Sequence, residues 1–173
     1  MSVEMWNSVA SSWLEVSNQI NEADWGKPTG CEVWCIQDLF AHARETAVGT
    51  GNALGASLDS EADWGRIKEE VANQMSDPAN LEGVSEAHGG MPKQGVANIA
   101  IGDLLIHTWD LAEALGAKVD LPEDAINATL SGLKLMPEDT LRGKGMFGPA
   151  IGVSEDASAQ DQLLAFTGRQ PKQ

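Results

Sequence analysis

Apolar residues recur every three to four positions along most of this chain, which is the spacing of one helix face. The pattern predicts helices over residues 3–22, 31–53, 60–76, 96–116, 122–136 and 158–167. Residues 79–92 are polar and rich in glycine, as expected of a short hairpin or a crossover loop, and residues 137–157 predict an irregular strap. Helices joined mostly by short loops predict an all-α fold: a four-helix bundle with one longer crossover loop and extra C-terminal helices.

The stretch 96–116 is one of the two most apolar predicted helices, and it carries two unusual polar residues. Pro92 before it and Gly116 after it are typical of a helix start and a helix C-cap. Asp103 and His107 lie four residues apart, so both project from one face of a helix. A carboxylate and an imidazole on an apolar face cost free energy unless they pair or bind a ligand. They are therefore either a hydrogen-bonded pair or two of three ligands of a divalent metal.

A third candidate ligand, His42, lies midway along the second predicted helix. If this helix packs beside the central one, His42 can meet Asp103 and His107 at one point in the core. Two imidazoles and one carboxylate suit Zn²⁺, Ni²⁺ or Fe²⁺, with positions left open for water or substrate. Asp110, three residues after His107, either orients that histidine or faces solvent. Asp38, four residues before His42, has the same two interpretations.

The remaining chemically active residues follow no such pattern. His88 lies in a glycine-rich loop and is expected to be a solvated side chain. Cys31 and Cys35 have the spacing C-x3-C, which fits no zinc knuckle, so both are expected to be small buried or helix-entry residues. No general base stands out, and Glu45, about one turn from His42, is a candidate.

The composition excludes several classes of protein. At 173 residues the chain has the length of one domain, and its 42% hydrophobic content is ordinary for a globular protein. A net charge of −15 argues against nucleic acid and anionic membrane surfaces as partners. No apolar run reaches the ~18 residues of a membrane-spanning helix, and the N-terminus has no basic signal-peptide region. Two cysteines make no disulfide scaffold. The expected location is the cytoplasm.

Three stretches together resemble one known family. TGCEVWCIQDLFAH (29–42) is similar to that family's tryptophan followed by DL-x-x-H at the entry to its second helix. IGDLLIHTWDLAEALG (101–116) closely resembles its D-x3-H-x-WDLA-x-A-x-G signature. FGPAIGVSEDASAQDQLLAFTGRQP (147–171) resembles its C-terminal segment, which ends in TGR-x-P. The family is the mycothiol-dependent maleylpyruvate isomerase-like, metal-binding branch of the DinB-like four-helix bundles, and the likeness covers nearly the whole chain.

The resemblance implies a single metal-binding bundle, residues 1–173, with a zinc-like or nickel-like ion held by His42, Asp103 and His107. The isomerase itself has the longer glutamate where this chain has Asp103, and it has an additional C-terminal domain. Maleylpyruvate isomerisation is therefore not expected here. The broader implication is a metal-dependent transferase that acts with a low-molecular-weight thiol such as mycothiol.

Three hypotheses follow from these residues and this resemblance. In the first, the metal binds a small thiol, lowers its pKa, and the thiolate attacks a small electrophilic substrate. The second is a non-catalytic metal-binding or ligand-binding module. The third is a structural bundle, dimerising through exposed apolar faces, in which Asp103 and His107 only pair with each other.

Overall fold

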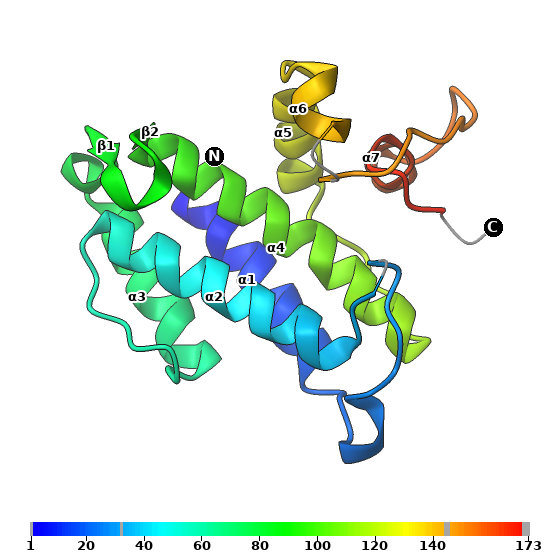
Figure 1. The fold of residues 1–173 in the computed structure, drawn as a ribbon, viewed down its shortest axis with the longest axis horizontal. Helices are drawn as coiled ribbons and strands as arrows, with labels where there is room; N and C mark the ends of the chain where they lie inside the picture. Colours follow the sequence, from blue (N-terminus) through cyan, green and yellow to red (C-terminus); the bar gives the residue numbers. More distant parts are fainter. Residues whose placement is uncertain (1, 32, 144–145, 171–173) are drawn as a thin grey trace. The chain divides into compact units, whose positions relative to one another are not determined.

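The computed structural model describes residues 2–31, 33–143 and 146–170, and these residues are predominantly helical. The described α-helices are α1 (Val3–Ser17), α2 (Ile36–Leu54), α3 (Trp64–Ser76), α4 (Lys93–Leu115), α5 (Glu123–Lys134), α6 (Glu138–Arg142) and α7 (Ala159–Phe166) (Figure 1). Short 3-10 turns are η1 (Glu22–Asp24), η2 (Pro78–Leu81) and η3 (Glu86–His88), and β1 (Val84–Ser85) pairs antiparallel with β2 (Met91–Pro92). The all-α prediction is confirmed.

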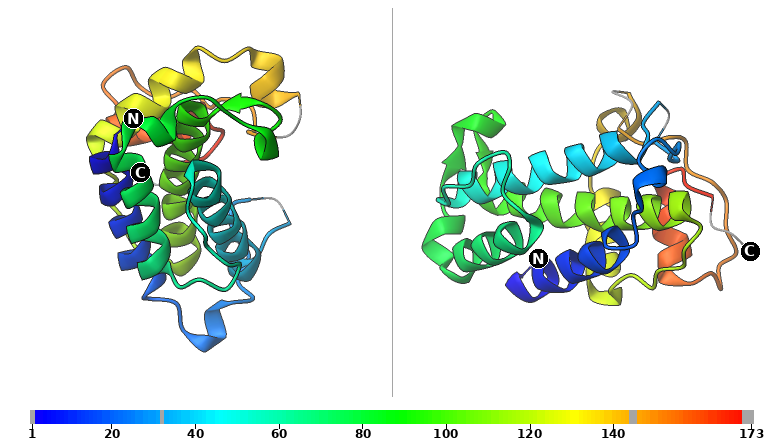
Figure 2. Two further views of the ribbon diagram at one scale, coloured as in Figure 1. Left: turned by 90° about the vertical axis from the view of Figure 1, so that its left-hand side faces the viewer. Right: turned by 90° about the horizontal axis from the view of Figure 1, so that it is seen from below.

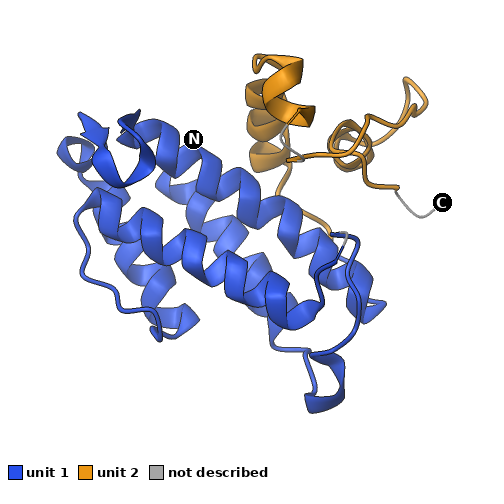
Figure 3. Ribbon diagram, viewed as in Figure 1, with its two compact units in different colours: residues 1–119 blue, residues 120–173 orange. Residues whose placement is uncertain are grey.

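Two compact units make up the chain, residues 1–119 and residues 120–173, here called the first and the second unit (Figure 3). The expectation of a single domain stays a prediction, because compactness alone says nothing of independent folding. The second unit begins before residue 137, where the irregular C-terminal strap was expected to start. Among the described residues, no helix is both long and apolar enough to cross a membrane.

In the first unit the four long helices α1, α2, α3 and α4 pack around one core (Figures 1 and 2). Helix α4 packs against α1 and α2, and α3 packs against the same two helices. Large side chains that are fully buried in this core include Trp6, Trp13, Leu39, Ile67, Ile101 and Leu105. Each such side chain contributes roughly 1.5–3 kcal/mol by leaving water. This packing brings the middle of α2 beside the middle of α4.

The second helix begins five residues later than its apolar pattern predicts. The backbone N–H of Cys35 donates to Oδ2 of Asp38 at 3.0 Å, which fixes Cys35 as the N-cap and Ile36 as the first helical residue. Residues 28–31 and 33–35 belong to a loop instead, which is closed by a bridge between Pro28 and Cys35. The prediction that the helix starts at Cys31 was wrong. Cys31 lies in the loop that precedes the helix.

The other helix boundaries differ less. Helix α1 ends at Ser17 rather than at residue 22, because Asp24 caps a separate turn by accepting from the backbone N–H of Asn21 at 2.8 Å. Helix α3 begins after Asp63, whose carboxylate accepts from the backbone N–H of Arg66, rather than at residue 60. Of the two structures expected at residues 79–92, the structure shows the short hairpin, β1–β2.

The central helix α4 is formed much as expected. It begins after Pro92 and ends before Gly116, whose φ of +71° is a left-handed conformation that glycine adopts without strain. Apolar residues bury it on most sides, and the polar side chains His107, Thr108 and Asp110 are buried with them. Polar groups this deep need partners on the protein or on a ligand.

The second unit contains α5, α6 and α7, with α5 packed against α7. Ser158 caps α7 by accepting from the backbone N–H of Asp161, so the helix lies within the range 158–167 expected for it. Helix α6 corrects the expectation of an irregular strap over 137–157. Its last residue, Arg142, pairs with Glu138 at 3.0 Å and donates to the carbonyl of Phe166 at 2.8 Å, so the short helix is tied to α7.

Candidate metal centre

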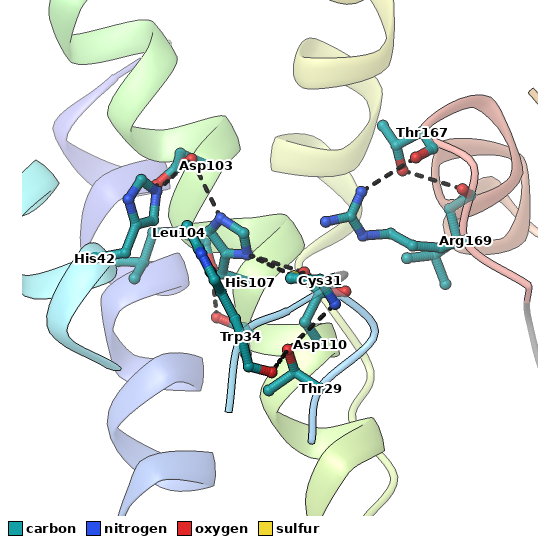
Figure 4. Close-up of polar contacts among 12 residues, drawn as sticks. Thr29, Cys31, Trp34, His42, Asp103, Leu104, His107, Asp110, Thr167 and Arg169 are labelled. Carbon is teal, nitrogen blue, oxygen red and sulfur yellow. Dashed lines mark hydrogen bonds and ion pairs between the residues drawn. The ribbon is translucent and has the colours of Figure 1, made fainter. Parts of the chain in front are cut away.

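Three side chains from two helices converge in the first unit (Figure 4). His42 comes from α2, and Asp103 and His107 come from α4, one turn apart. Nε2 of His42 lies 3.3 Å from Oδ2 and 3.4 Å from Oδ1 of Asp103. Nε2 of His107 lies 3.5 Å from Oδ1 of Asp103. One donor atom of each residue lies within 4.8 Å of the other two, so the three candidate ligands meet at one point.

The spacing of these atoms fits a small divalent cation. Two ligand atoms that each lie about 2.0–2.1 Å from a tetrahedral zinc are about 3.3–3.4 Å apart, and the N···O distances here are 3.3–3.5 Å. As charge-assisted hydrogen bonds the same distances are long, since such bonds are usually about 2.7–2.9 Å. Oδ2 of Asp103 is also buried without a hydrogen-bond partner among the described residues. The residues therefore fit a metal of the zinc, nickel or iron class.

One side of this cluster is open to solvent. The exposed fraction is 34% for the side chain of His42, 25% for Asp103 and 11% for His107. Three protein ligands with one accessible side are typical of catalytic zinc sites, in which water or substrate takes the remaining position, and not of closed structural sites. The arrangement can thus hold an ion and still admit a further ligand.

The far nitrogen of His107 has its own carboxylate. Nδ1 of His107 lies 2.9 Å from Oδ2 of Asp110, which is also on α4 and is 1% exposed. A carboxylate at this position fixes the orientation and tautomer of an imidazole and leaves Nε2 for a metal. The sequence alone allowed Asp110 either to orient His107 or to face solvent, and the structure places it against the ring.

Cys31 joins this second group from the loop before α2. Its Sγ lies 3.2 Å from Oδ2 of Asp110 and 3.9 Å from Nδ1 of His107. Cys31, His107 and Asp110 therefore also have ligand atoms within 4.8 Å of one another. Because Nδ1 of His107 already makes a hydrogen bond of 2.9 Å to Asp110, we assign this second group to orienting the ring and not to holding the ion.

The two carboxylates set the charge of His107 when no metal is bound. Burial lowers the pKa of His107, but its hydrogen bonds to Asp103 and Asp110 outweigh burial and raise that pKa well above its ordinary value. Burial raises the pKa of Asp103, but its hydrogen bonds with His107 and His42 hold that pKa well below its usual range. Without metal the cluster is an imidazolium between carboxylates, and an ion must displace its proton.

Trp34 covers the two histidines from the same loop that carries Cys31. The centre of its ring lies 4.8 Å from that of His42 and 5.9 Å from that of His107. The carbonyl of Trp34 accepts from both the backbone N–H and the hydroxyl of Thr29 at 2.9 Å, which holds the loop in place. The indole therefore shields one side of the cluster from water.

The other candidate residues lie elsewhere. Asp38 accepts from the backbone N–H and the thiol of Cys35, both at 3.0 Å, so it caps α2 and is not placed to orient His42. Glu45 is exposed, and the structure gives it no contact with the cluster within the described chain. His88 is exposed in η3, as expected of a loop histidine, but its Nδ1 lies 2.9 Å from Oγ of Ser85.

Sequence reasoning missed the contributions of Cys31 and Trp34. Both lie before the cap at Cys35, where the apolar spacing of residues 31–36 is compatible with a helix and does not indicate a loop over the histidines. The signal that could have found them is Asp38, an acidic residue three positions after Cys35, where it can cap a helix.

No protein-family model and no solved structure matches this chain. The uncharacterized protein Rv0738 of Mycobacterium tuberculosis (strain ATCC 25618 / H37Rv) is 28% identical over an alignment of 156 residues, which covers 83% of this chain and 84% of that protein. The uncharacterized protein MT0763 of Mycobacterium tuberculosis (strain CDC 1551 / Oshkosh) has the same identity and coverage. The likeness extends over most of both chains and indicates a protein of similar length.

Proposed function

We propose that this chain is a divalent-metal-binding protein in which His42, Asp103 and His107 hold a zinc, nickel or iron ion. We further propose that the metal activates a low-molecular-weight thiol, mycothiol or a similar one. The activated thiol would either be transferred to a small electrophilic substrate or promote isomerisation of that substrate. The resemblance of residues 29–42 and 101–116 to the mycothiol-dependent maleylpyruvate isomerase-like family supports the thiol. It also supports describing the four helices as a DinB-like bundle.

One observation in particular supports metal binding. Three nitrogen and oxygen donors from two helices, with His42 and Asp103 61 residues apart in sequence, meet at ligand spacing. They surround a buried carboxylate oxygen of Asp103 that has no hydrogen-bond partner in the described part of the chain. Bringing one carboxylate and two imidazoles together costs desolvation free energy, which three long contacts recover poorly. A bound cation offsets that cost directly.

The metal and the surrounding residues would have separate roles in the proposed reaction. A divalent metal, when bound, supplies a Lewis acid that lowers the pKa of a coordinated thiol. Asp110 keeps Nε2 of His107 directed at the ion, and Trp34 keeps water from one side. The exposed side near His42 is the entry for thiol and electrophile. Glu45 has no contact with the cluster within the described chain, so we assign no general base.

The alternatives differ in what they require. A structural bundle needs only the ion pairs of Asp103 and binds no metal. A metal-binding module without catalysis needs the ion but no thiol turnover. Metal content separates the first alternative from the proposal, and thiol consumption separates the second.

The test begins with metal content measured by mass spectrometry on protein purified without chelator. Wild type should hold a stoichiometric ion, and His42→Ala and His107→Ala should each lose it. His88→Ala, which removes the third histidine of the chain outside the cluster, is the matched control and should keep the ion. Loading with zinc, nickel and iron in turn covers loss of the ion during purification, and no binding after that would reject the proposal.

A second measurement tests the thiol. Metal-loaded protein is mixed with a small thiol and the chromogenic electrophile chlorodinitrobenzene, and formation of the conjugate is followed by absorbance. Conjugation that depends on both the metal and His42 supports the transferase. Metal bound stoichiometrically with no conjugation, and no change in the spectrum of cobalt-loaded protein on adding thiol, would leave only the non-catalytic module.

A further inference from the structure

A pocket of about 240 Å³ lies in the first unit between α2, α4 and the β1–β2 hairpin. Helix α2 contributes Thr46 and Thr50 to its wall, and α4 contributes Val96, Ile99 and Ala100. The wall is mostly apolar with a few hydroxyl groups, as in sites that bind small organic molecules. Its volume lies below the range of about 300–1,000 Å³ typical of pockets for drug-sized ligands, so it suits a smaller molecule.

The pocket continues the two helix faces that carry the candidate metal ligands. On α2, Thr46 lies one turn beyond His42, and Thr50 lies one turn further. On α4, Ile99 lies one turn before Asp103. At a helical rise of ~1.5 Å per residue, Thr46 and Thr50 lie about 6 Å and about 12 Å along α2 from His42. Thr46 and Ile99 of the pocket wall each stand one helical turn from a candidate ligand, so a molecule seated in the pocket has its near end about one turn from the metal centre.

The exposed side chain of Ile99 indicates that the pocket favours an apolar ligand. Ile99 is 51% exposed, although its neighbours in the wall, Val96 and Ala100, are 3% and 2% exposed. An isoleucine half in water beside buried apolar residues gains free energy when an apolar ligand covers it. The hydroxyl-bearing Thr50 is 2% exposed at the far end of the wall.

His88 supplies the polar end of the pocket. Oγ of Ser85, in the hairpin, lies 2.9 Å from Nδ1 of His88 and fixes the ring. Nε2 faces α2, because a Cβ added at Gly49 would stand 4.0 Å from it. Within the described chain Nε2 has no hydrogen-bond partner, and His88 is the titratable residue of the wall. A ligand oxygen can therefore bond to Nε2 without displacing a protein group.

We propose that this pocket binds the apolar body of a small organic molecule, with a carboxylate or carbonyl oxygen at Nε2 of His88 and its reacting end at the metal centre. The inference rests on the proposed function for the reacting end. It adds the class of molecule: a short aliphatic chain or a single ring with an oxygen acceptor at the end remote from the metal.

The probe is a series of ω-mercapto acids, mercaptopropionate, mercaptohexanoate and mercaptooctanoate, titrated by calorimetry into zinc-loaded protein. Affinity should rise by about fourfold for each added methylene until the pocket is full. His88→Ala should weaken mercaptohexanoate about tenfold and leave hexanethiol, which has no carboxylate, unchanged. Glu86→Ala, an exposed residue of the same turn, is the matched control and should change neither.

Gly49→Leu tests the pocket itself. A Cβ at Gly49 meets nothing nearer than 4.0 Å, and Gly49 lies inside α2, where leucine has the higher helix propensity, so the variant should fold. The longer side chain should fill the pocket and weaken mercaptohexanoate and hexanethiol alike. An affinity independent of chain length, or full mercaptohexanoate binding in Gly49→Leu, would overturn the proposal.

Failure of the metal centre and failure of the pocket are separable. Zinc content is measured for every variant, and neither His88→Ala nor Gly49→Leu should change it. If wild type binds none of zinc, nickel and iron, the proposed function fails, and hexanoate and octanoate titrated into metal-free protein decide the pocket alone. Chain-length dependence that Gly49→Leu removes would then uphold the pocket, and its absence would reject it.

Discussion

The two sides of His107 differ in the properties that separate a metal ligand from a supporting residue. On the open side, Nε2 faces Asp103 and His42 at the centre of the cluster; on the buried side, Nδ1 faces Asp110 and Cys31. The open-side carboxylate lies 3.5 Å from the ring and is 25% exposed. The buried-side carboxylate lies 2.9 Å away and its side chain is 0% exposed.

The position of an aspartate on a helix does not by itself decide whether it binds a metal or supports a ligand. Asp103 and Asp110 flank the same imidazole on the same helix, one four residues before it and the other three residues after. Asp110 makes a hydrogen bond of ordinary length, whereas Asp103 stands between two imidazoles at distances that suit a shared ion better than a shared proton. Substituting each aspartate separately therefore tests the two roles directly.

The largest effect is expected from Asp103→Asn. The amide has nearly the same shape but no charge, so the site loses its anionic ligand and zinc affinity should fall by more than the roughly 10–100-fold seen for outer partners. Calorimetry measures the affinity. In thermal unfolding, zinc at a hundredfold excess over its Kd should stabilise wild type by about 2.7 kcal/mol and the variant hardly at all. Zinc binding by Asp103→Asn as tight as wild type would reverse the roles assigned to the two sides.

Asp110→Asn is expected to weaken zinc binding by about 10–100-fold without abolishing it. The amide can still accept from Nδ1 of His107, but it no longer strengthens the imidazole as a ligand. The stoichiometry in calorimetry should stay as in wild type. Asp156→Asn removes the same charge from an exposed loop and should leave the affinity unchanged. A greater loss in Asp110→Asn than in Asp103→Asn would place the ion on the buried side.

Proton release is expected to accompany zinc binding. Because the pKa of His107 is raised well above its ordinary value, the metal-free protein holds a proton there at neutral pH. Zinc should displace about one proton per ion at pH 7, and the number should fall as pH rises through the folded pKa of His107. Calorimetry in buffers of different ionisation enthalpy measures it. No proton release at pH 7 would mean that His107 is neutral before the metal binds.

The raised pKa of His107 also predicts how the stability of the metal-free protein changes with pH. A histidine whose pKa is raised in the folded state contributes stability that is complete below its unfolded pKa and is lost as pH rises through the folded pKa. The contribution of His107 should therefore be present at neutral pH and fade on the alkaline side. Denaturant unfolding of chelator-treated protein across that range measures it, with His107→Gln as the control that should lack this dependence.

Much of the fold and the core of the candidate site could be predicted from local patterns. Asp103 and His107 share a face because helix periodicity places residues four apart together, and Pro92 and Gly116 mark the ends of that helix. The meeting of His42 with them depended on which helices pack side by side. From spacing alone, His42 could be placed near Asp103 and His107 only if these two helices pack side by side. The structure shows that α2 does pack on α4.

The other parts of the site depend on tertiary contacts, which the spacing of residues along the sequence does not predict. The cap at Cys35, a residue that seldom caps helices, decides that Cys31 and Trp34 lie in a loop over the histidines. Asp38 and Asp110 had identical interpretations from spacing, yet one caps α2 and the other holds His107, because only tertiary packing shows which groups face them.

The smallest effect is expected from Cys31→Ser, and it tests the buried side without disturbing its hydrogen bond. A serine hydroxyl can still donate to Asp110, and the sulfur lies 3.9 Å from a nitrogen that is already bonded to that carboxylate. Zinc affinity should therefore stay within about threefold of wild type. Cobalt-loaded wild type should also lack the near-ultraviolet absorption of a thiolate bound to cobalt. If that absorption appears and Cys31→Ser removes it together with the metal, the ion sits between Cys31, His107 and Asp110, and Asp103 becomes the residue that orients the ring.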